Sequence, residues 1–243
     1  MTGTAKLVGV GVGPGDPELL TLKAVRALQA ADVVSYFAKA GRPSNARTIA
    51  AAQIKPDVIE LPLLYPVTSE LPRGCEAYQD AIGKFFDTSA TLIAAHLDRG
   101  RTVAVLCEGD PLFYGSYMHL HARLTARYPG EVIAGVSGMS GCWSAAGAPI
   151  AQGDDVFMVI PGTLPQSELE RRLEDASAAV VMKLGRNLPK VRRALERTGD
   201  IARAIYVERG TMADTVVMPL AAKNDDDAPY FAMVLLPGWE KGR

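Results

Sequence analysis

The sequence has few cysteines, no long apolar run and no excess of charge of either sign. Its three cysteines, Cys75, Cys107 and Cys142, are far apart and form no CxxC pair, so we expect neither a disulfide framework nor a metal site. Lysine plus arginine number 26 and aspartate plus glutamate 27, which predicts no general affinity for nucleic acid or anionic membranes. No segment approaches the roughly 18 apolar residues of a membrane span. The start of the chain has no secretory pattern, so we expect a cytoplasmic protein.

Several common catalytic and nucleotide-binding motifs are also absent. No G-K-[ST] sequence occurs, which excludes a P-loop. A G-x-G-x-x-G fingerprint fails because Pro14 and Asp16 stand where glycine is required. His119 and His121 are two residues apart, so on a helix they point in different directions and make no metal pair. No serine or cysteine has a recognisable catalytic base in the sequence, so no catalytic side chain is predicted.

What is present is the composition of an ordinary globular protein with alternating strands and helices. Of 243 residues, 48% are hydrophobic and 22% are charged, enough apolar material for one large or two small domains. In the first half, the alternation predicts an α/β fold whose strands pair in parallel. We expect a helix over 18–30 capped by Asp16, and a polar loop over 39–47. The expected strands are 6–12, 33–37, 58–61, 102–107 and 132–133, and the other expected helices are 76–97 and 115–127.

The second half repeats this alternation after a linker-like stretch, residues 148–155. We therefore expect two α/β domains, an N-terminal one over 1–150 and a C-terminal one over 151–243, with a mainly parallel first sheet and a mixed second sheet. The last two strands have no helix between them, which favours an antiparallel edge. The expected strands are 156–160, 178–184, 204–207, 215–220 and 230–236, and the expected helices are 166–173 and 188–197.

Three loops of the first domain follow predicted strands and are rich in small and polar residues: 12–16, 108–113 and 135–140. Ligands of α/β sheets bind at the carboxyl ends of strands, and glycine lets a ligand approach the backbone. Glu108 and Asp110 place two carboxylates at one strand end, where they could accept hydrogen bonds from a ribose or an amino group. Taken singly, the first loop could equally be a plain glycine turn between strand and helix. The second could equally be a solvated turn with Asp110 as a helix cap.

Taken together, the loops resemble a known family. The run VGVGPGDPELLTLKAVRALQAADVV, Val10–Val34, resembles the opening motif of the tetrapyrrole methylases, which methylate uroporphyrinogen III and precorrins. The second family motif is similar to VAVLCEGDPLFYGS, Val103–Ser116. Gly135-Val136-Ser137 and Val181-Met182-Lys183 resemble the third and fourth. The motifs occur in order along the whole chain.

This resemblance implies a two-domain homodimeric enzyme that uses S-adenosyl-L-methionine, which such proteins bind in a cleft between their domains. The balanced charge predicts no partner among nucleic acids or membranes. The usual family sequence has glycine where this chain has Glu108, which leaves the role of that side chain open. The residues that match the family's cofactor contacts are Pro14, Glu108, Gly109, Asp110, Ser137, Gly138, Met182 and Ala232.

Within the family, the segment Gly109–His119 most resembles the precorrin-2 C20-methyltransferases of cobalamin biosynthesis. That resemblance implies methyl transfer to C20 of precorrin-2 to give precorrin-3A, with Tyr114, Ser116 and His119 facing the tetrapyrrole. The cobalt form of precorrin-2, or methylation of another precorrin carbon, stays open. The group that accepts the C20 proton also stays open. The aromatic residues of the segment Gly109–His119 could instead pack the helix that follows onto the sheet.

Precorrins carry many carboxylates, and several loop cations could pair with them: Lys39, Arg42, Arg47 and Arg73. The alternative is that these cations are solvated surface charges. We place Lys39 and Arg42 among the expected substrate-binding residues. Two other readings are a fold relative that methylates RNA or protein and a nicotinamide oxidoreductase. An RNA methylase would be expected to have a larger excess of basic residues than this chain has. A nicotinamide oxidoreductase would be expected to have the G-x-G-x-x-G spacing, which is missing here.

Overall fold

The structure is a computed structural model that describes residues 5–66 and 75–240, and it divides into two compact units. The units are Met1–Ser137 and Gly138–Arg243, whereas the sequence suggested a boundary at residues 150 and 151. The helix after Ser137 belongs to the second unit because its Cys142 is buried against the second sheet with Val180 and Val207. Among the described residues, no helix has both the length and the apolarity of a membrane span.

The first unit is built on a five-stranded sheet in the order β3-β2-β4-β1-β5. Every strand pair in it is parallel, as the alternation of strands and helices predicts. Strands β1 and β4 are buried along their whole length, which suits a sheet covered on both faces. The strands are β1 (Leu7–Gly11), β2 (Val33–Lys39), β3 (Ile59–Tyr65), β4 (Val103–Cys107) and β5 (Gly130–Ile133).

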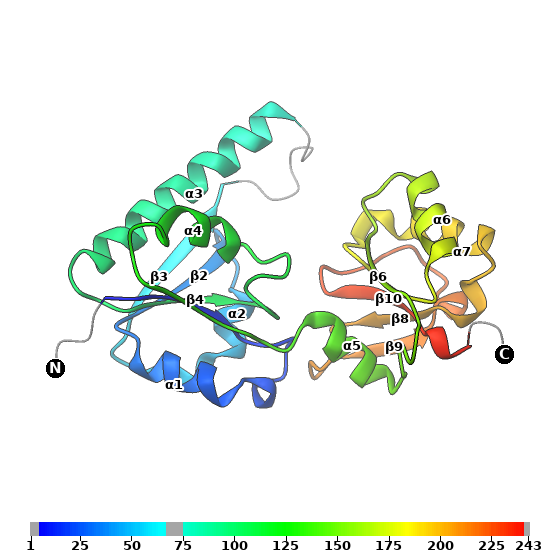
Figure 1. The fold of residues 1–243 in the computed structure, drawn as a ribbon, viewed down its shortest axis with the longest axis horizontal. Coiled ribbons are helices and arrows are strands. Elements are labelled where there is room, and N and C mark those ends of the chain that lie inside the picture. The colour runs from blue at the N-terminus through cyan, green and yellow to red at the C-terminus, as the bar shows by residue number, and fades with distance from the viewer. Residues whose placement is uncertain (1–4, 67–74, 241–243) are drawn as a thin grey trace. The chain divides into compact units, whose positions relative to one another are not determined.

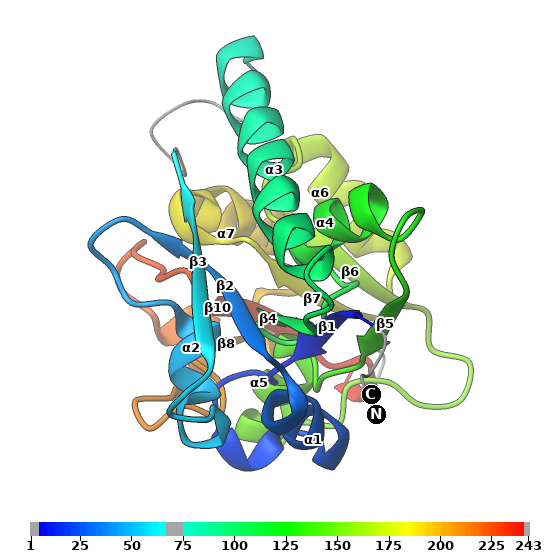
Figure 2. The same ribbon diagram turned by 90° about the vertical axis from the view of Figure 1, so that its left-hand side faces the viewer.

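Helices cover both faces of this sheet (Figure 1, Figure 2). Helices α3 and α4 pack on one face, where Phe86, Ile93 and Leu120 join one apolar cluster. Helices α1 and α2 pack on the other face, around Leu28 and Ile49. The helices are α1 (Leu22–Ala30), α2 (Asn45–Ile49), α3 (Glu76–Leu97) and α4 (Tyr117–Leu124), with the 3-10 helices η1 (Pro17–Leu19) and η2 (Ala51–Gln53).

Two predictions for the first unit were wrong in detail. Asp16 caps only η1, through the N–H of Glu18, while Thr21 caps α1 by accepting the N–H of Ala24 at 3.1 Å. The expected loop over 39–47 contains the start of α2, because Ser44 supplies a helix cap and Ala46 and Ile49 are buried.

Strand β3 is longer than expected and includes a proline. Among the residues that the structure describes, it pairs with β2 alone, from Ile59 opposite Val33 to Tyr65 opposite Lys39. Pro62 is tolerated there because an edge strand has one side without ladder hydrogen bonds. The loop cation Arg73 lies outside the described residues.

The second unit contains a mixed five-stranded sheet in the order β6-β7-β10-β8-β9. β6 and β7 are parallel, and β10 is antiparallel to both β7 and β8. The expectation that both last strands lie at an edge is right for β9 and wrong for β10, which is central and has four buried residues among its five. The strands are β6 (Phe157–Pro161), β7 (Ala178–Met182), β8 (Ile205–Glu208), β9 (Val216–Pro219) and β10 (Ala232–Leu236).

Helices again cover both faces of the second sheet. Leu169 of α6 and Val191 of α7 pack on the face that carries Tyr206, while α5 packs on the other face through Cys142. The sequence did not predict α5, because its small residues form no clear apolar stripe. The helices are α5 (Gly138–Ala146), α6 (Gln166–Asp175) and α7 (Leu188–Arg197), with the 3-10 helices η3 (Gly185–Asn187), η4 (Ile201–Arg203), η5 (Leu220–Ala222) and η6 (Gly238–Glu240).

Candidate functional site

The order of strands in the first sheet creates a point where the chain changes direction. Strands β1 and β4 are neighbours, but the chain leaves β1 toward β2 and leaves β4 toward β5, on opposite sides. In parallel α/β sheets, ligands bind outside the carboxyl ends of strands at such a switch point. The loops that flank it are 12–16 and 108–116, and the loop after β5 lies beside them because β5 pairs with β1.

Glycines hold these three loops in backbone contact. The N–H of Gly109 donates to the carbonyl of Gly13 at 2.8 Å. A Cβ atom added to Gly135 would lie 2.0 Å from the carbonyl oxygen of Gly109, and one added to Gly11 would lie 2.6 Å from the Cα of Gly135. Gly13 and Gly109 also have φ angles of 80° and 62°, in the region that favours glycine. We call these four glycines the glycine junction, and no other residue type fits its closest contacts.

The two carboxylates of the second loop are directed at protein backbone. Asp110 accepts the N–H of Leu112 at 2.9 Å and, through its other oxygen, the N–H of Gly135 at 3.1 Å. Glu108 accepts the N–H of Ala46 at 3.2 Å. Burial raises the pKa of Glu108, against the lowering effect of hydrogen bonds from its own backbone N–H and from that of Ala46. Both side chains therefore brace the loop, and Asp110 ties the second loop to the third.

Five of the expected cofactor residues come together in the first unit. Pro14 is buried directly after Gly13, and Ser137 follows Gly135 by two residues. Glu108, Gly109 and Asp110 lie between them at the end of β4. A site of this kind offers backbone N–H and carbonyl groups and little reactive side-chain chemistry.

The remaining three cofactor candidates belong to the second unit. Met182 is the last residue of β7, and Ala232 is the first residue of β10, which runs antiparallel to β7. They therefore lie at the same end of the second sheet. Gly138 begins α5, and a Cβ atom added to it would lie 3.1 Å from the Cε of Met233, the residue after Ala232.

The expected tetrapyrrole contacts Tyr114, Ser116 and His119 lie in and after the second loop. Tyr114 is 47% exposed and has a φ angle of 55°, which is strained for a residue with a side chain. The hydroxyl of Ser116 hydrogen-bonds that of Tyr65, at the end of β3. His119 stacks on the ring of Phe86 with 4.1 Å between ring centroids. The structure thus brings Ser116 and His119 against neighbouring elements and leaves Tyr114 exposed.

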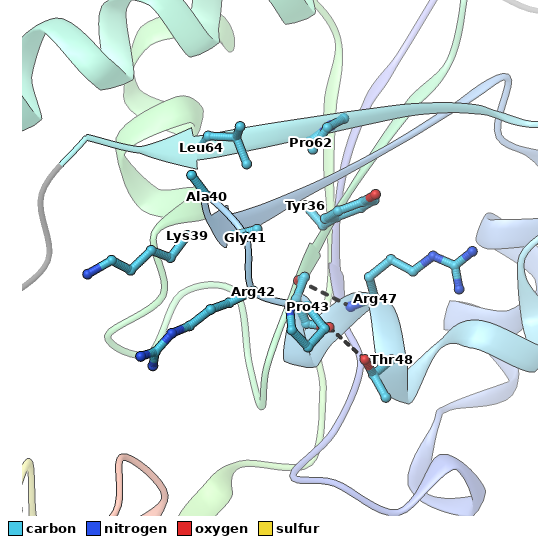
Figure 3. A pocket seen from close by; sticks show the side chains of 12 residues that line it. Tyr36, Lys39, Ala40, Gly41, Arg42, Pro43, Arg47, Thr48, Pro62 and Leu64 are labelled. Atoms are coloured by element: carbon cyan, nitrogen blue, oxygen red, sulfur yellow. Dashed lines mark hydrogen bonds between the residues drawn. The ribbon is translucent and has the colours of Figure 1, made fainter.

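A basic pocket of about 490 Å³ lies near the carboxyl ends of β2 and β3. It includes both expected cations, Lys39 and Arg42, whose side chains extend to the same side in Figure 3. Arg47 also lines the pocket, but it forms two hydrogen bonds with Glu60, at 2.7 and 3.2 Å. The residues of this basic pocket are Tyr36, Ala38, Lys39, Ala40, Gly41, Arg42, Pro43, Ser44, Arg47, Thr48, Pro62 and Leu64.

The titratable groups near the switch point include no activated nucleophile among the described residues. Burial raises the pKa of the Cys107 thiol, which keeps it protonated and unreactive. Burial and the charge of Arg123 lower the pKa of His119, so its imidazole is neutral at pH 7. The arrangement can bind and align two molecules, and it does not resemble a site for covalent catalysis.

Comparison with known proteins identifies the family. The model of the Tetrapyrrole (Corrin/Porphyrin) Methylases matches residues 6–223. The chain belongs to the tetrapyrrole methylase family. It is 60% identical over 238 residues to a precorrin-2 C(20)-methyltransferase of Sinorhizobium sp., an alignment that covers 98% of this chain and 97% of that protein. It is 48% identical to the cobalamin biosynthesis protein CobIJ of Mycobacterium tuberculosis, of which it spans 47%.

More distant tetrapyrrole methylases match the chain in sequence or in fold. A cobalt-precorrin-2 C(20)-methyltransferase of Salmonella typhimurium is 25% identical over 97% of this chain and 98% of its own length. The structure of a cobalt precorrin-4 methyltransferase superposes with a TM-score of 0.73 at 22% identity, covering 98% of this chain and 96% of that one. A uroporphyrin-III C-methyltransferase from Thermus thermophilus, complexed with S-adenosylhomocysteine, has a TM-score of 0.65 at 24% identity and covers 96% and 97%. The predictions of family and fold are confirmed.

Among the contacts of the site that were missed from the sequence, two join segments more than 50 residues apart. Glu108 meets Ala46 across 62 residues, and Tyr65 meets Ser116 across 51. No motif spacing signals either contact, because both depend on how β2, β3 and β4 are ordered in the sheet. The one available signal was that Glu108 departs from the glycine usual at its position in the family.

Proposed function

We propose that this protein transfers a methyl group from S-adenosyl-L-methionine to C20 of precorrin-2, giving precorrin-3A and S-adenosylhomocysteine in cobalamin biosynthesis. The observation that carries the proposal is the 60% identity to a precorrin-2 C(20)-methyltransferase over nearly the full length of both chains. The glycine junction at the switch point supports it, since methyl transfer from an activated cofactor mainly needs alignment of the reactants.

The residues present fit the cofactor. The glycine junction packs the three loops backbone against backbone, and the small and polar residues of these loops are of the kind whose N–H and carbonyl groups a nucleoside and an amino acid can meet closely. When bound, the cofactor supplies an electrophilic methyl group on a sulfonium. The residues proposed to hold it are Pro14, Glu108, Gly109, Asp110, Ser137, Gly138, Met182 and Ala232, with Glu108 acting through its backbone because its carboxylate faces Ala46.

The tetrapyrrole is proposed to contact the basic pocket and the segment after the second loop. Lys39 and Arg42 provide positive charge for its carboxylates. Tyr114 offers an exposed aromatic surface, while Ser116 and His119 offer hydrogen-bonding groups at the start of α4. The chain's part in the reaction is to seat the macrocycle so that C20 faces the methyl group.

Metal-free precorrin-2 is favoured over its cobalt form. Identity is 60% to the relative named for precorrin-2 and 25% to the relative named for cobalt-precorrin-2. The test is to incubate the purified protein with each form and measure S-adenosylhomocysteine. We expect faster turnover with the metal-free substrate. Equal or faster turnover of the cobalt form would overturn this preference, and no turnover of either would refute the proposed function.

Cofactor binding has a test of its own in Gly109→Val. The substitution places a branched side chain at a φ angle of 62°, in the loop proposed to meet the cofactor. Calorimetric titration with S-adenosylhomocysteine is expected to show a loss of affinity of at least about tenfold. Unchanged affinity in a folded Gly109→Val protein would remove this loop from the site.

We also propose that the protein works as a homodimer, on the basis of its family resemblance. Sedimentation at micromolar concentration is expected to give twice the mass of the 243-residue chain. A monomer under these conditions would end this proposal and leave the catalytic one intact.

A further inference from the structure

Glu108 stands where the candidate cofactor loop meets the basic pocket. In the parallel register of β2 and β4, Leu106 lies opposite Tyr36, and Glu108 follows two residues later, just after the end of β4. Tyr36 and Ala38 both line the basic pocket. The carboxylate of Glu108 reaches the N–H of Ala46, at the start of α2. One residue of β4's terminal loop therefore holds the helix that forms one wall of the pocket.

Helix α2 depends on this contact because it is short. It spans Asn45–Ile49, and the first N–H groups of any helix lack partners within the helix. Ser44 accepts the N–H of Arg47 at 3.4 Å, and Glu108 accepts that of Ala46 at 3.2 Å. Ala46 is only 2% exposed, so water is poorly placed to replace the carboxylate.

The next residue along the chain has a different partner. The N–H of Gly109 donates to Gly13 at 2.8 Å, within the glycine junction. Glu108 and Gly109 thus connect α2 on one side with the loop after β1 on the other. Burial raises the pKa of Glu108, while hydrogen bonds from its own N–H and from that of Ala46 lower it, so the carboxylate and the start of α2 stabilise each other.

We propose that Glu108 is a positioning residue for the tetrapyrrole: its side chain fixes α2 and the adjoining Lys39–Ser44 loop relative to the cofactor loop. This inference rests on the proposed function, since it assigns the basic pocket to the carboxylated substrate. The side chain acts on substrate binding through α2, while cofactor binding depends on the backbone of the same loop. Loss of the carboxylate is therefore expected to weaken the tetrapyrrole more than the cofactor.

Three variants test this positioning role. Glu108→Ala removes the acceptor, and Glu108→Gln keeps an acceptor oxygen in nearly the same volume. The matched control is Asp32→Ala, because Asp32 also accepts a backbone N–H, that of Thr102 at 2.8 Å, but at the opposite end of the sheet. In each protein we would measure amide hydrogen exchange without ligands, the KM and kcat for precorrin-2, and the affinity for S-adenosylhomocysteine.

Glu108→Ala is expected to accelerate exchange in peptides covering Asn45–Ile49 and to raise the KM about tenfold, with a smaller change in kcat. The affinity for S-adenosylhomocysteine is expected to change less than about threefold. Glu108→Gln should restore most of the KM, and Asp32→Ala should leave it unchanged. Unchanged exchange at α2 in Glu108→Ala, or a loss of cofactor affinity with an unchanged KM, would overturn the inference.

The exchange measurement keeps this inference separate from the proposed function. It uses no substrate, so it reports whether Glu108 holds α2 even if the protein methylates a different compound. Absence of methyl transfer by the unmodified protein would contradict the proposed function alone. Normal turnover by the unmodified protein, combined with unchanged exchange at α2 in Glu108→Ala, would contradict the positioning role alone.

Discussion

The two ends of the first sheet use polar groups in different ways. At the amino ends of β1 and β5, Lys6 and Lys23 both pair with Glu131. At the carboxyl ends, the contacts that join the loops are made by glycine backbone and by Asp110, which accepts the N–H of Gly135. The amino end carries ion pairs at the surface in addition to its backbone hydrogen bonds, whereas the carboxyl end has a buried junction built mainly of glycine main chain.

This difference explains where substitutions can be tolerated. A surface ion pair can be lost at small cost, because water solvates the remaining charge. A backbone junction has no such freedom, since an added side chain must displace the main chain of another loop. Function is therefore expected to be most sensitive at the carboxyl end, and stability alone to respond at the amino end.

The largest effect is expected from Gly135→Ala. The new Cβ atom would lie 2.0 Å from the carbonyl oxygen of Gly109, a contact that only a shift of one loop can relieve. We expect a loss of about 3 kcal/mol or more in the free energy of unfolding, together with loss of binding of S-adenosylhomocysteine. Chemical denaturation and calorimetric titration measure the two effects.

The matched control is Gly83→Ala, in the middle of α3, where an added Cβ atom meets nothing within 4 Å. Because alanine favours helix more than glycine does, this change is expected to stabilise the protein by about 0.5–1 kcal/mol and leave binding unchanged. Equal effects of the two substitutions would show that the glycine junction is not special.

An intermediate effect is expected in the basic pocket. Removing both cations, in Lys39→Ala with Arg42→Ala, should raise the KM for precorrin-2 by about tenfold with little change in stability. The control is Arg26→Ala, an exposed cation on α1. Steady-state kinetics at two salt concentrations provide the measurement, since added salt should reduce the difference between variant and unmodified protein. A KM that is insensitive to both substitutions would exclude the pocket from the substrate site.

The smallest effect is expected at the amino end, in Glu131→Gln. Hydrogen bonds from Lys23 and Lys6 lower the pKa of Glu131 from its ordinary value of 4.5 to about 2. A carboxylate whose pKa is lowered by folding stabilises the protein above its unfolded pKa, and that contribution is lost as the pH falls from 4.5 toward 2. Unmodified protein should therefore exceed Glu131→Gln in stability by about 1 kcal/mol at pH 7, and by less at pH 3.

Urea denaturation at the two pH values measures this difference, and methyl transfer at pH 7 should be the same in both proteins. A loss of activity in Glu131→Gln that exceeds its loss of stability would contradict the division of roles between the two ends of the sheet.

The sequence predicted best the elements whose pattern is local. The expected bounds of α3 and α7 agree with the structure because apolar residues mark one face of each helix throughout its length. The sequence predicted less well the features that depend on contacts with distant parts of the chain, such as the position of a strand within its sheet. Nothing in Ala232–Leu236 alone says that β10 is paired on both sides, and Gly138–Ala146 is too rich in small residues to indicate a helix.

The same division applies to the candidate site. The three loops were predicted because glycine-rich segments after strands meet at one edge of a parallel sheet. The backbone N–H donors to the Glu108 and Asp110 carboxylates were not predicted, since Ala46 and Gly135 become their neighbours only once β4 lies between β2 and β1. These carboxylates connect distant segments by hydrogen bonds only because of the order of the strands, and no local sequence pattern encodes that order.

The most direct test of the account is the position of the transferred methyl group. Purified protein would be incubated with precorrin-2 and S-adenosyl-L-methionine labelled with carbon-13 in its methyl group, and the product analysed by carbon NMR. We predict one labelled methyl group at C20 and an equal amount of S-adenosylhomocysteine. Label at another ring carbon, such as C11 or C17, would contradict the assignment to C20, and the absence of transfer to any precorrin would contradict the proposed function as a whole.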